Sequence, residues 1–325
     1  MTLRRIALIL TAGIVLVALQ AGLAAQSGSF HRQYQVNGPV TLIVHNGSGD
    51  VHVSAMPGRT VTIDAVIRSH FNFFFGASPQ DIQRIEQNPP VTQNGNTIRI
   101  DEVHSGWMSN ISIRYTITTP PNTEVRAETG SGDLYLSSLQ RSARLGTGSG
   151  DIHLDNLGGG VHASTGSGDI TFGRIQGDAE FSTGSGDVRG REVTGHAHLS
   201  TGSGDVRIEE MDQGGYAGTG SGQLSVGQVT GELTAHSGSG DLTIQGQLNG
   251  DHHWDLRTGS GELHIALTGG SAAQAQLSTD SGDITVRLPS RNVSTSRHSW
   301  TGVIGNGAAA ATLNAHAGSG DIVVH

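Results

Sequence analysis

The sequence of 325 residues contains no cysteine. This absence excludes disulfide bonds, thiolate metal sites, cysteine nucleophiles and a lipid-modified N-terminal cysteine. After the first apolar run, which ends at Leu19, no segment is long enough to span a membrane, because a span needs about 20 apolar residues. The sequence therefore predicts no transmembrane segment in the chain that follows the N-terminal run.

The signatures of several common binding and catalytic sites are also missing. No Gly-x-Gly-x-x-Gly segment opens a helix and no Gly-Lys-Ser/Thr occurs, so no phosphate-binding loop is predicted. The Gly-x-Ser-x-Gly motif of a serine nucleophile is absent. The net charge of −9 disfavours nucleic acid and anionic lipid as partners, because proteins that bind them carry basic patches. We therefore assign no catalytic residue and no cofactor.

What the sequence has instead is a five-residue phrase, Thr-Gly-Ser-Gly-Asp, that returns at a constant interval of eighteen positions. It stands at 129–133, 147–151, 165–169, 183–187 and 201–205, with close variants at 219–223 and 237–241. A fixed period of this length is typical of a solenoid, in which each repeat is one coil stacked on the last. Glycine is unfavourable inside helices, and apolar and polar residues alternate around each phrase, so the coils are predicted to be β-strands.

Residues at equivalent positions of successive repeats form columns of like character. One column holds Phe181 and Leu199, and others hold Val206 and Ile208. Parallel, in-register strands about 4.8 Å apart would produce such columns. We therefore predict that Leu199, Val206 and Ile208 are buried, and that the alternate residues His198 and Arg207 are exposed. The period is compatible with a flattened two-sheet coil and with a triangular one.

The paired glycines of the phrase are expected to mark one corner of every coil. Glycine permits backbone angles that a side chain forbids, so a bend or bulge there would turn each coil at the same place. The serine between them could bond to the backbone of the corner or to the equivalent serine of the adjacent coil. The structural glycines of the five best copies are Gly130, Gly132, Gly148, Gly150, Gly166, Gly168, Gly184, Gly186, Gly202 and Gly204.

The phrase ends in an acidic column that allows two interpretations. Its members are Asp133, Asp151, Asp169, Asp187, Asp205 and Asp241. The favoured interpretation is a corner-capping, solvent-facing carboxylate. The alternative is a calcium ladder, because stacked carboxylates repel each other and Ca²⁺ prefers oxygen ligands. The calcium nonapeptide repeat has a residue between its last Gly and Asp, which this phrase lacks, and Gln223 replaces the acid at one coil.

The chain before the regular repeats divides at about residue 25. Residues 1–25 have a short basic start, an apolar run and small residues at 22–25, which predict a cleaved secretory signal peptide, with a retained anchor as the alternative. Residues 26–128 are strand-rich and are expected to form an N-terminal cap and irregular first coils. Within them, 79–85 predicts a short capped helix and Asn94-Gly95 a hairpin turn.

A cluster of four phenylalanines interrupts this cap. Phe71, Phe73, Phe74 and Phe75 could fill the core of the cap, or they could form an exposed tip that contacts a partner. Histidines such as His153, His162 and His198 fall at outward positions. His162 and His198 lie two coils apart, which is too far to share one metal.

Residues 129–325 are expected to form a solenoid that is regular at first and degenerate later. After Asp241 the phrase returns at wider intervals, and the copies end at Glu262, Asp283 and Asp321. Residues 289–312 should therefore form one degenerate coil with an excursion, or one coil and a loop. The chain ends in Ile322-Val323-Val324-His325, so the terminal strand is expected to belong to the final coil.

The repeated Gly-Ser-Gly-Asp followed by alternating aliphatic residues, preceded by Asn94–Ile100 and Tyr115–Thr123, resembles the bacterial "putative adhesin" family of domains of unknown function. The resemblance covers about residues 36–325. It implies an exported β-solenoid, surface binding, and no catalytic residues.

Taken together, these features predict an exported, noncatalytic, all-β parallel solenoid (β-helix). It would act outside the cytoplasm, in the periplasm or at the cell surface, as a binding or structural element, with a glycan or another cell-surface polymer as candidate partner. The competing hypothesis is a polysaccharide lyase or hydrolase built on a β-helix. Retaining glycosidases hold two carboxyls about 5 Å apart, near the spacing of the acidic column. However, acid–base catalysis needs carboxyls in unlike surroundings, which a repeated column does not provide.

Overall fold

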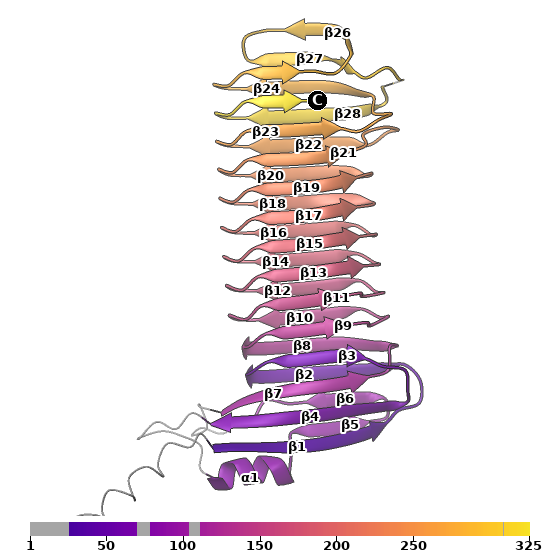
Figure 1. Ribbon diagram of the computed structural model, residues 1–325, viewed down its shortest axis with the longest axis vertical. Coiled ribbons are helices and arrows are strands. Elements are labelled where there is room, and N and C mark those ends of the chain that lie inside the picture. The colour runs from indigo at the N-terminus through magenta and orange to yellow at the C-terminus, as the bar shows by residue number, and fades with distance from the viewer. Residues whose placement is uncertain (1–25, 70–78, 104–110, 308) are drawn as a thin grey trace, which may run out of the picture.

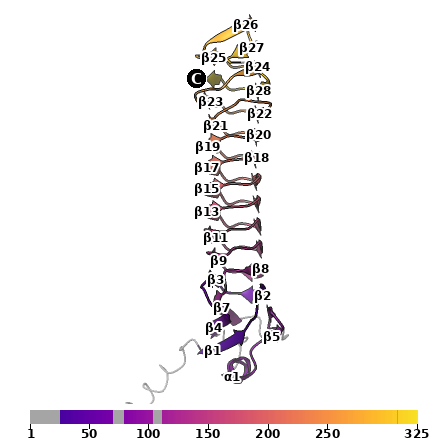
Figure 2. The ribbon, with the colours of Figure 1, turned by 90° about the vertical axis from the view of Figure 1, so that its right-hand side faces the viewer.

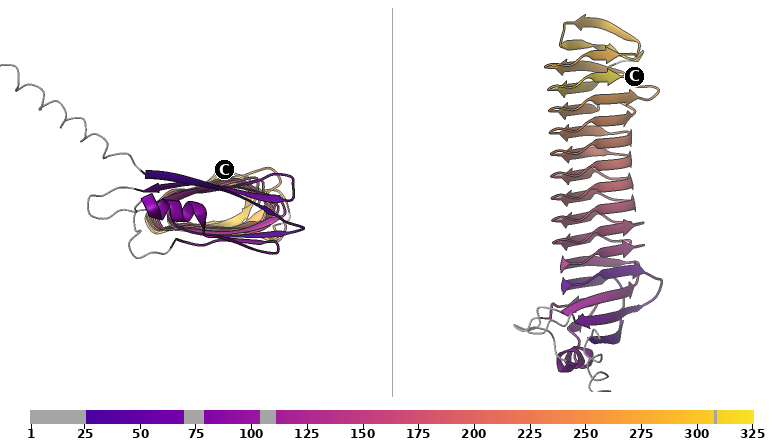
Figure 3. Two further views of the ribbon diagram at one scale, coloured as in Figure 1. Left: turned by 90° about the horizontal axis from the view of Figure 1, so that it is seen from below. Right: turned by 60° about the vertical axis from the view of Figure 1, so that its left-hand side comes forward.

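The computed structural model describes residues 26–69, 79–103, 111–307 and 309–325. In this part of the chain, two long β-sheets lie face to face along one axis (Figures 1 and 2). Sheet A has 14 strands and sheet B has 15. Seen along the axis, the stack is a flattened ring (Figure 3). The predicted all-β solenoid is confirmed, and its coils have the two-sheet form rather than the triangular one.

Each regular coil places one strand in each sheet. In sheet B these are β8 (Thr123–Ser131), β10 (Ala143–Thr147), β12 (Val161–Thr165), β14 (Ala179–Thr183), β16 (Ala197–Thr201), β18 (Gly214–Thr219), β20 (Glu232–Ser237) and β22 (His253–Thr258). In sheet A they are β9 (Leu134–Ser137), β11 (Ile152–Asp155), β13 (Ile170–Ile175), β15 (Val188–Val193), β17 (Val206–Met211), β19 (Leu224–Val229), β21 (Leu242–Gly246) and β23 (Leu263–Leu267). Neighbouring strands of a sheet are parallel and paired in register, so that Leu145 lies opposite Ala163.

The core is the thin space between the sheets, filled by the predicted columns. Leu199, Val206 and Ile208 are at most 1% exposed, whereas His198 and Arg207 are exposed. The side chain of Phe181 is fully buried in the middle of the stack. The predicted register is therefore confirmed. Large and small residues mix within some columns, as Leu145, Ala163 and Phe181 do, which lets a narrow interior pack without voids.

One column contains a glycine where its neighbours carry aliphatic or aromatic side chains. A Cβ built on Gly190 would lie 1.9 Å from the ring of Phe172, which belongs to the coil before it. The Phe172 ring also packs across the core against Phe181, with ring centroids 4.7 Å apart. The absence of a side chain at Gly190 therefore makes room for one large ring shared by two coils.

The N-terminal cap closes one end of both sheets. The coil formed by β2 (Val40–Ser48) and β3 (Val51–Ala55) stacks directly on β8 and β9. Beyond it lie β6 (Thr97–Ile100) and β7 (Ile111–Thr119), and then the antiparallel strands β4 (Thr60–Ser69), β1 (Gln26–Gln35) and β5 (Val91–Asn94). Helix α1 (Pro79–Gln87) buries Ile82 and Ile85, and Figure 1 shows it beneath β1. Both the predicted helix and the hairpin at Asn94-Gly95 are present.

At the C-terminal end, the order of coils in space differs from their order in the sequence. The last strands of the chain, β28 (Ala311–Ala317) and β29 (Ile322–Val324), lie between β22/β23 and the earlier coil of β24 (Ala273–Thr279) and β25 (Ile284–Val286). Figure 1 shows the C-terminus below the end of the stack. The terminal strand β29 belongs to the coil that comes last in the sequence, as expected, but that coil lies one position inside the end of the stack.

The reason lies in the segment between these strands. Strands β26 (Ser290–Thr295) and β27 (Ser299–Ile304) form an antiparallel hairpin that pairs with the outer side of β24. The hairpin caps this end by extending sheet B past β24, so that the exposed strand β26 becomes its edge strand. With that side of β24 occupied, the returning chain pairs with its inner side. The predicted excursion at 289–312 is this cap.

Candidate functional site

The corner of each coil is held by its threonine, which lies inside the solenoid. The hydroxyl of Thr165 accepts a hydrogen bond from the backbone N–H of Gly168 at 3.1 Å and donates one to the carbonyl of Gly150, in the coil before, at 2.9 Å. The equivalent bonds recur from Thr147 to Thr219. These threonines are buried, so the expectation that the middle serine binds the corner backbone is wrong for these coils: the threonine does so.

The acidic column binds the backbone of the next coil. The N–H of Asp151 donates to Oδ1 of Asp133 at 2.9 Å, and the N–H of Asp169 donates to Oδ1 of Asp151 at 2.8 Å. Equivalent bonds recur in the following coils, the last of this run being donated by the N–H of Gln223 to Oδ1 of Asp205. This geometry is what the corner-capping interpretation predicts. Among the described residues, no group of three or more potential metal ligands is placed to hold an ion.

The corner glycines are needed for close stacking rather than for unusual backbone angles. A Cβ on Gly168 would lie 1.9 Å from the carbonyl oxygen of Gly150, and one on Gly186 would lie 2.0 Å from that of Gly168. Of the ten predicted glycines only Gly132 has a positive φ, 158°, which is close to extended backbone. The sequence therefore predicts the positions correctly, but the expected reason, angles forbidden to side chains, is wrong.

Two predicted features lie outside the described residues: the signal peptide at 1–25 and the cluster of Phe71, Phe73, Phe74 and Phe75. The interpretations of both segments remain predictions. Within the described part of the chain, no helix has the length and apolar character that crossing a bilayer requires.

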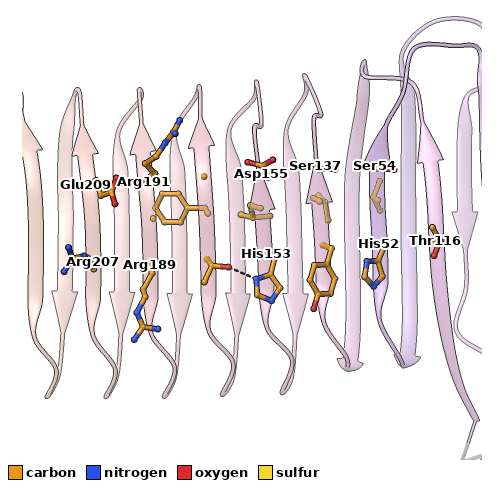
Figure 4. Close-up of a pocket in the computed structure, with 18 residues that line it drawn as sticks. His52, Ser54, Thr116, Ser137, His153, Asp155, Arg189, Arg191, Arg207 and Glu209 are labelled. Atoms are coloured by element: carbon orange, nitrogen blue, oxygen red, sulfur yellow. Dashed lines mark hydrogen bonds between the residues drawn. The ribbon is translucent and has the colours of Figure 1, made fainter.

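A trough of about 820 Å³ runs along the outer face of sheet A, across the strands from β7 to β17 (Figure 4). Two columns of outward side chains form its walls. One wall comprises Thr116, His52, Tyr135, His153, Thr171, Arg189 and Arg207. The other comprises Ser54, Ser137, Asp155, Arg191 and Glu209, with a gap at Gly173. Residues two apart on a strand point to the same face of the sheet. The two columns therefore run parallel to each other along the whole trough.

Stacked rings form one end of the first wall. Tyr135 lies between His52 and His153, with ring centroids 4.3 and 4.6 Å apart and ring planes within 19° of parallel. Beyond them, Nδ1 of His153 hydrogen-bonds to the hydroxyl of Thr171 at 2.6 Å. Since the ring faces cover one another, the stack presents ring edges to the trough.

Two of these rings, His52 and Tyr135, are uncharged near neutral pH. Burial lowers the pKa of His52, and the nearby carboxylate of Asp50 only partly opposes this. Burial and the negative charge of Asp133 both raise the pKa of Tyr135. For Asp50, burial raises the pKa, but hydrogen bonds from Arg114 and from the N–H of Asp133 outweigh burial, so that the pKa is lowered. His52 and Tyr135 therefore add no charge to this end of the trough.

Arginines form the other end. Arg189 forms an ion pair with Asp187 and a longer one, 3.5 Å, with Asp169, both in the acidic column. Arg191 lies 3.9 Å from the buried carboxylate of Glu192, which binds Arg174 more closely at 2.7 Å. Within the part of the chain that the structure describes, Arg207 makes no ion pair, and its side chain is exposed.

A second trough, of about 1120 Å³, crosses the outer face of sheet B. Some of its charged groups pair with one another, as Arg126 does with Glu124. Nδ1 of His162 lies 2.9 Å from Oε2 of Glu180, and this hydrogen bond lowers the pKa of the glutamate. His198 stacks on Tyr216 with centroids 4.7 Å apart. The predicted outward positions of His162 and His198 are confirmed, with Glu180 between them in the column.

Neither trough was predicted from the sequence. The sequence nevertheless contains the information that predicts the outward columns. His153, Thr171, Arg189 and Arg207 recur with the same period as the phrase. His52 follows Asp50 by two positions, as Tyr135 follows Asp133, so aligning the early phrase at 46–50 would have placed the ring stack. The troughs do not follow from the apolar and acidic columns alone, because they are formed by the outward residues on either side of each buried position.

Comparison with known proteins places the chain in a family. The family model described as Toastrack DUF4097 matches residues 23–215 and 161–325, which together span most of the chain. The chain belongs to the Toastrack family. The resemblance to a family of unknown function that the repeat phrase indicated is thereby confirmed. No curated protein matches this Toastrack chain.

Several solved structures are similar to the Toastrack chain at low identity. A "putative cell adhesion protein" from Clostridium sporogenes is 10% identical, with 92% of this chain and 99% of that chain covered and a TM-score of 0.23. A "putative adhesin" from Bacteroides fragilis is 14% identical, with 92% and 97% covered and a TM-score of 0.33. Another from Parabacteroides distasonis is 10% identical, with 73% and 92% covered and a TM-score of 0.35.

Proposed function

We propose that this Toastrack protein is an exported, noncatalytic binding protein that holds a linear cell-surface polymer, such as a glycan, along its flat faces. The observation that carries the proposal is the arrangement of outward side chains in straight columns on two long sheets. Columns of this kind offer many weak, similar contacts, which suit a polymer through multivalency. The signal-like composition of residues 1–25 supports export.

The contacts of the acidic column argue against the competing hypothesis of a polysaccharide lyase or hydrolase. Each ladder carboxylate accepts the backbone N–H of the next coil, in nearly the same way from Asp133 to Asp205. Acid–base catalysis needs two carboxyls whose surroundings push their pKa values apart. It also needs a few unlike groups that converge on one point. The repetition of the column supports binding rather than catalysis.

The proposal can be tested with a glycan array and a length series. The chain from residue 26 onward, which contains every described element, would be screened against glycans, and its affinity measured for a bound polymer and for its oligomers. We expect the affinity to rise steeply with ligand length, because additional weak contacts are made within one complex. The polymer should keep its length during prolonged incubation. Shortening of the polymer, abolished by Asp187→Asn, would contradict the noncatalytic proposal.

A further inference from the structure

We infer that His196 and His198 together bind one divalent transition-metal ion, such as Zn²⁺ or Cu²⁺, on the outer face of sheet B. This inference goes beyond the proposed function and does not depend on it. It is carried by the spacing of the two histidines, by the contacts that hold them in place and by the two carboxylates of the neighbouring strand.

The spacing brings two imidazoles to the same face. The sequence has 16 histidines, and its only His-x-His segment is at residues 196–198. His198 lies on β16, and His196 directly precedes that strand. Both side chains are exposed and line the trough on sheet B, whereas Ala197 between them is buried. Residues two apart on a strand have Cα atoms about 6.6 Å apart, so two imidazoles can reach one ion between them.

The other histidines that line this trough have no such partner. His162 lies two coils from His198, about 9.6 Å away at the strand spacing, and Glu180 stands between them. Nδ1 of His162 is already occupied, because it lies 2.9 Å from Oε2 of Glu180. His253 follows His252 directly in the sequence, but His252 does not line the trough. The pair at 196 and 198 is therefore the place in this trough where two imidazoles can meet.

The fold holds both histidines in position before an ion binds. The backbone N–H of His196 donates a hydrogen bond to Oδ1 of Asp178 at 2.9 Å, and its carbonyl accepts one from the N–H of Ala179 at 2.9 Å. The ring of His198 stacks on Tyr216, with ring planes 18° from parallel. Less conformational freedom is lost when the ligands of an ion are already ordered, which favours binding.

The neighbouring strand adds negative charge beside the pair. Figure 1 shows β14 and β16 side by side in the middle of the stack. Glu180 pairs in register with His198, and Asp178 occupies the equivalent position beside His196. Two carboxylates next to the imidazoles attract a cation. On the other side of His196 the in-register residue is Gly214, which has no side chain to obstruct an ion.

The nitrogen ligands select the class of ion. Ca²⁺ and Mg²⁺ prefer oxygen ligands, whereas imidazole suits Zn²⁺ and Cu²⁺, and Cu²⁺ has the highest affinity of the common divalent ions. Among the described residues, no group of three or more ligands is arranged around one point. The protein therefore supplies two ligands, and water completes the coordination. An ion held in this way is exchangeable and keeps open positions that face the trough.

Titration of Cu²⁺ into the chain from residue 26 onward, followed by electron paramagnetic resonance, tests the inference. We expect the tightest site to show hyperfine splitting from two imidazole nitrogens. His196→Gln and His198→Gln should each weaken copper binding at least about tenfold, because a chelate becomes a single ligand. The splitting should then come from one nitrogen. The matched control His253→Gln removes an exposed histidine from the same trough and should leave both the affinity and the splitting unchanged.

Zinc provides a second arm of the test. One equivalent of Zn²⁺ should shift the ring resonances of His196 and His198 in nuclear magnetic resonance spectra, and those of His253 should stay in place. Ca²⁺ and Mg²⁺ should shift none of them. Both histidines are exposed, so the variants are expected to fold, and circular dichroism spectra would show this.

Each contrary outcome is definite. Equal weakening of copper binding by His253→Gln and His196→Gln would overturn the inference, because it would show adsorption to histidines in general. Full affinity in either His196→Gln or His198→Gln would overturn it as well. If Ca²⁺ bound as tightly as Zn²⁺, the carboxylates rather than the imidazoles would hold the ion, and the inference would fall. None of these results bears on polymer binding, which the glycan screen tests separately.

Discussion

Phe181→Asp is expected to unfold the central coils. The side chain of Phe181 is fully buried between the two sheets and packs against Phe172. Its replacement removes a large apolar side chain and places a carboxylate in a space with no polar partner for it. Loss of the ring alone costs about 3–5 kcal/mol, and the buried charge adds to this. A chemical denaturation curve followed by circular dichroism should show loss of the central strands at much lower denaturant concentration.

The matched control for this change is Ser182→Asp. Residue 182 follows directly on the same strand but points to the opposite side, where the side chain is partly exposed. The same carboxylate there should shift the unfolding free energy by no more than about 0.5 kcal/mol. Similar destabilisation by both substitutions, or an unchanged curve for Phe181→Asp, would mean that the assignment of inward and outward faces is wrong.

Gly168→Ala should have the second large effect, from a single added methyl group. Its Cβ would lie 1.9 Å from the carbonyl oxygen of Gly150 in the adjacent coil. This oxygen accepts the bond from Thr165 and belongs to the backbone, so it cannot move without disturbing the corner. We expect a loss of about 3 kcal/mol of unfolding free energy, the upper part of the usual range for overpacking.

Gly146→Ala is the control, and its expected effect has the opposite sign. The Cβ of this variant would meet ordinary contacts at 3.8 and 4.0 Å, and Gly146 has no positive φ. Replacing an unstrained glycine with alanine restricts the unfolded chain and stabilises the fold by about 0.4–1 kcal/mol. If Gly168→Ala were as stable as Gly146→Ala, close stacking would not be the reason for the corner glycines.

The sequence predicted most of the solenoid because its repeats constrain each other. The constant period of the phrase fixes the register, and the alternation around each phrase separates inward residues such as Val206 from outward ones such as Arg207. The cross-section could not be predicted, since the number of sheets depends on how sharply the corners bend. The buried threonine was missed because a hydroxyl next to glycines suggests a solvent-exposed turn.

The order of the last coils was missed for a different reason. The wide interval between Asp283 and Asp321 shows that a segment is inserted, but not which side of the neighbouring strand the returning chain pairs with. That choice depends on the hairpin of β26 and β27 occupying the outer side of β24. The troughs depend on outward columns, whose side chains vary freely without affecting the core. Their chemistry is visible only when the coils are placed side by side.

The stack itself can be tested most directly by distances between spin labels in a chain that has no native cysteine. One cysteine would replace Arg144, and the second would replace Thr234, Asn314 or Gln276, all in one outward column of sheet B. The backbone separations should be about 24, 34 and 38 Å, which correspond to five, seven and eight strand spacings. The label at 276 should therefore lie farther from 144 than the label at 314 does. A greater distance to 314, or distances that do not grow linearly with the number of coils, would contradict the in-register stack and its inserted C-terminal coil.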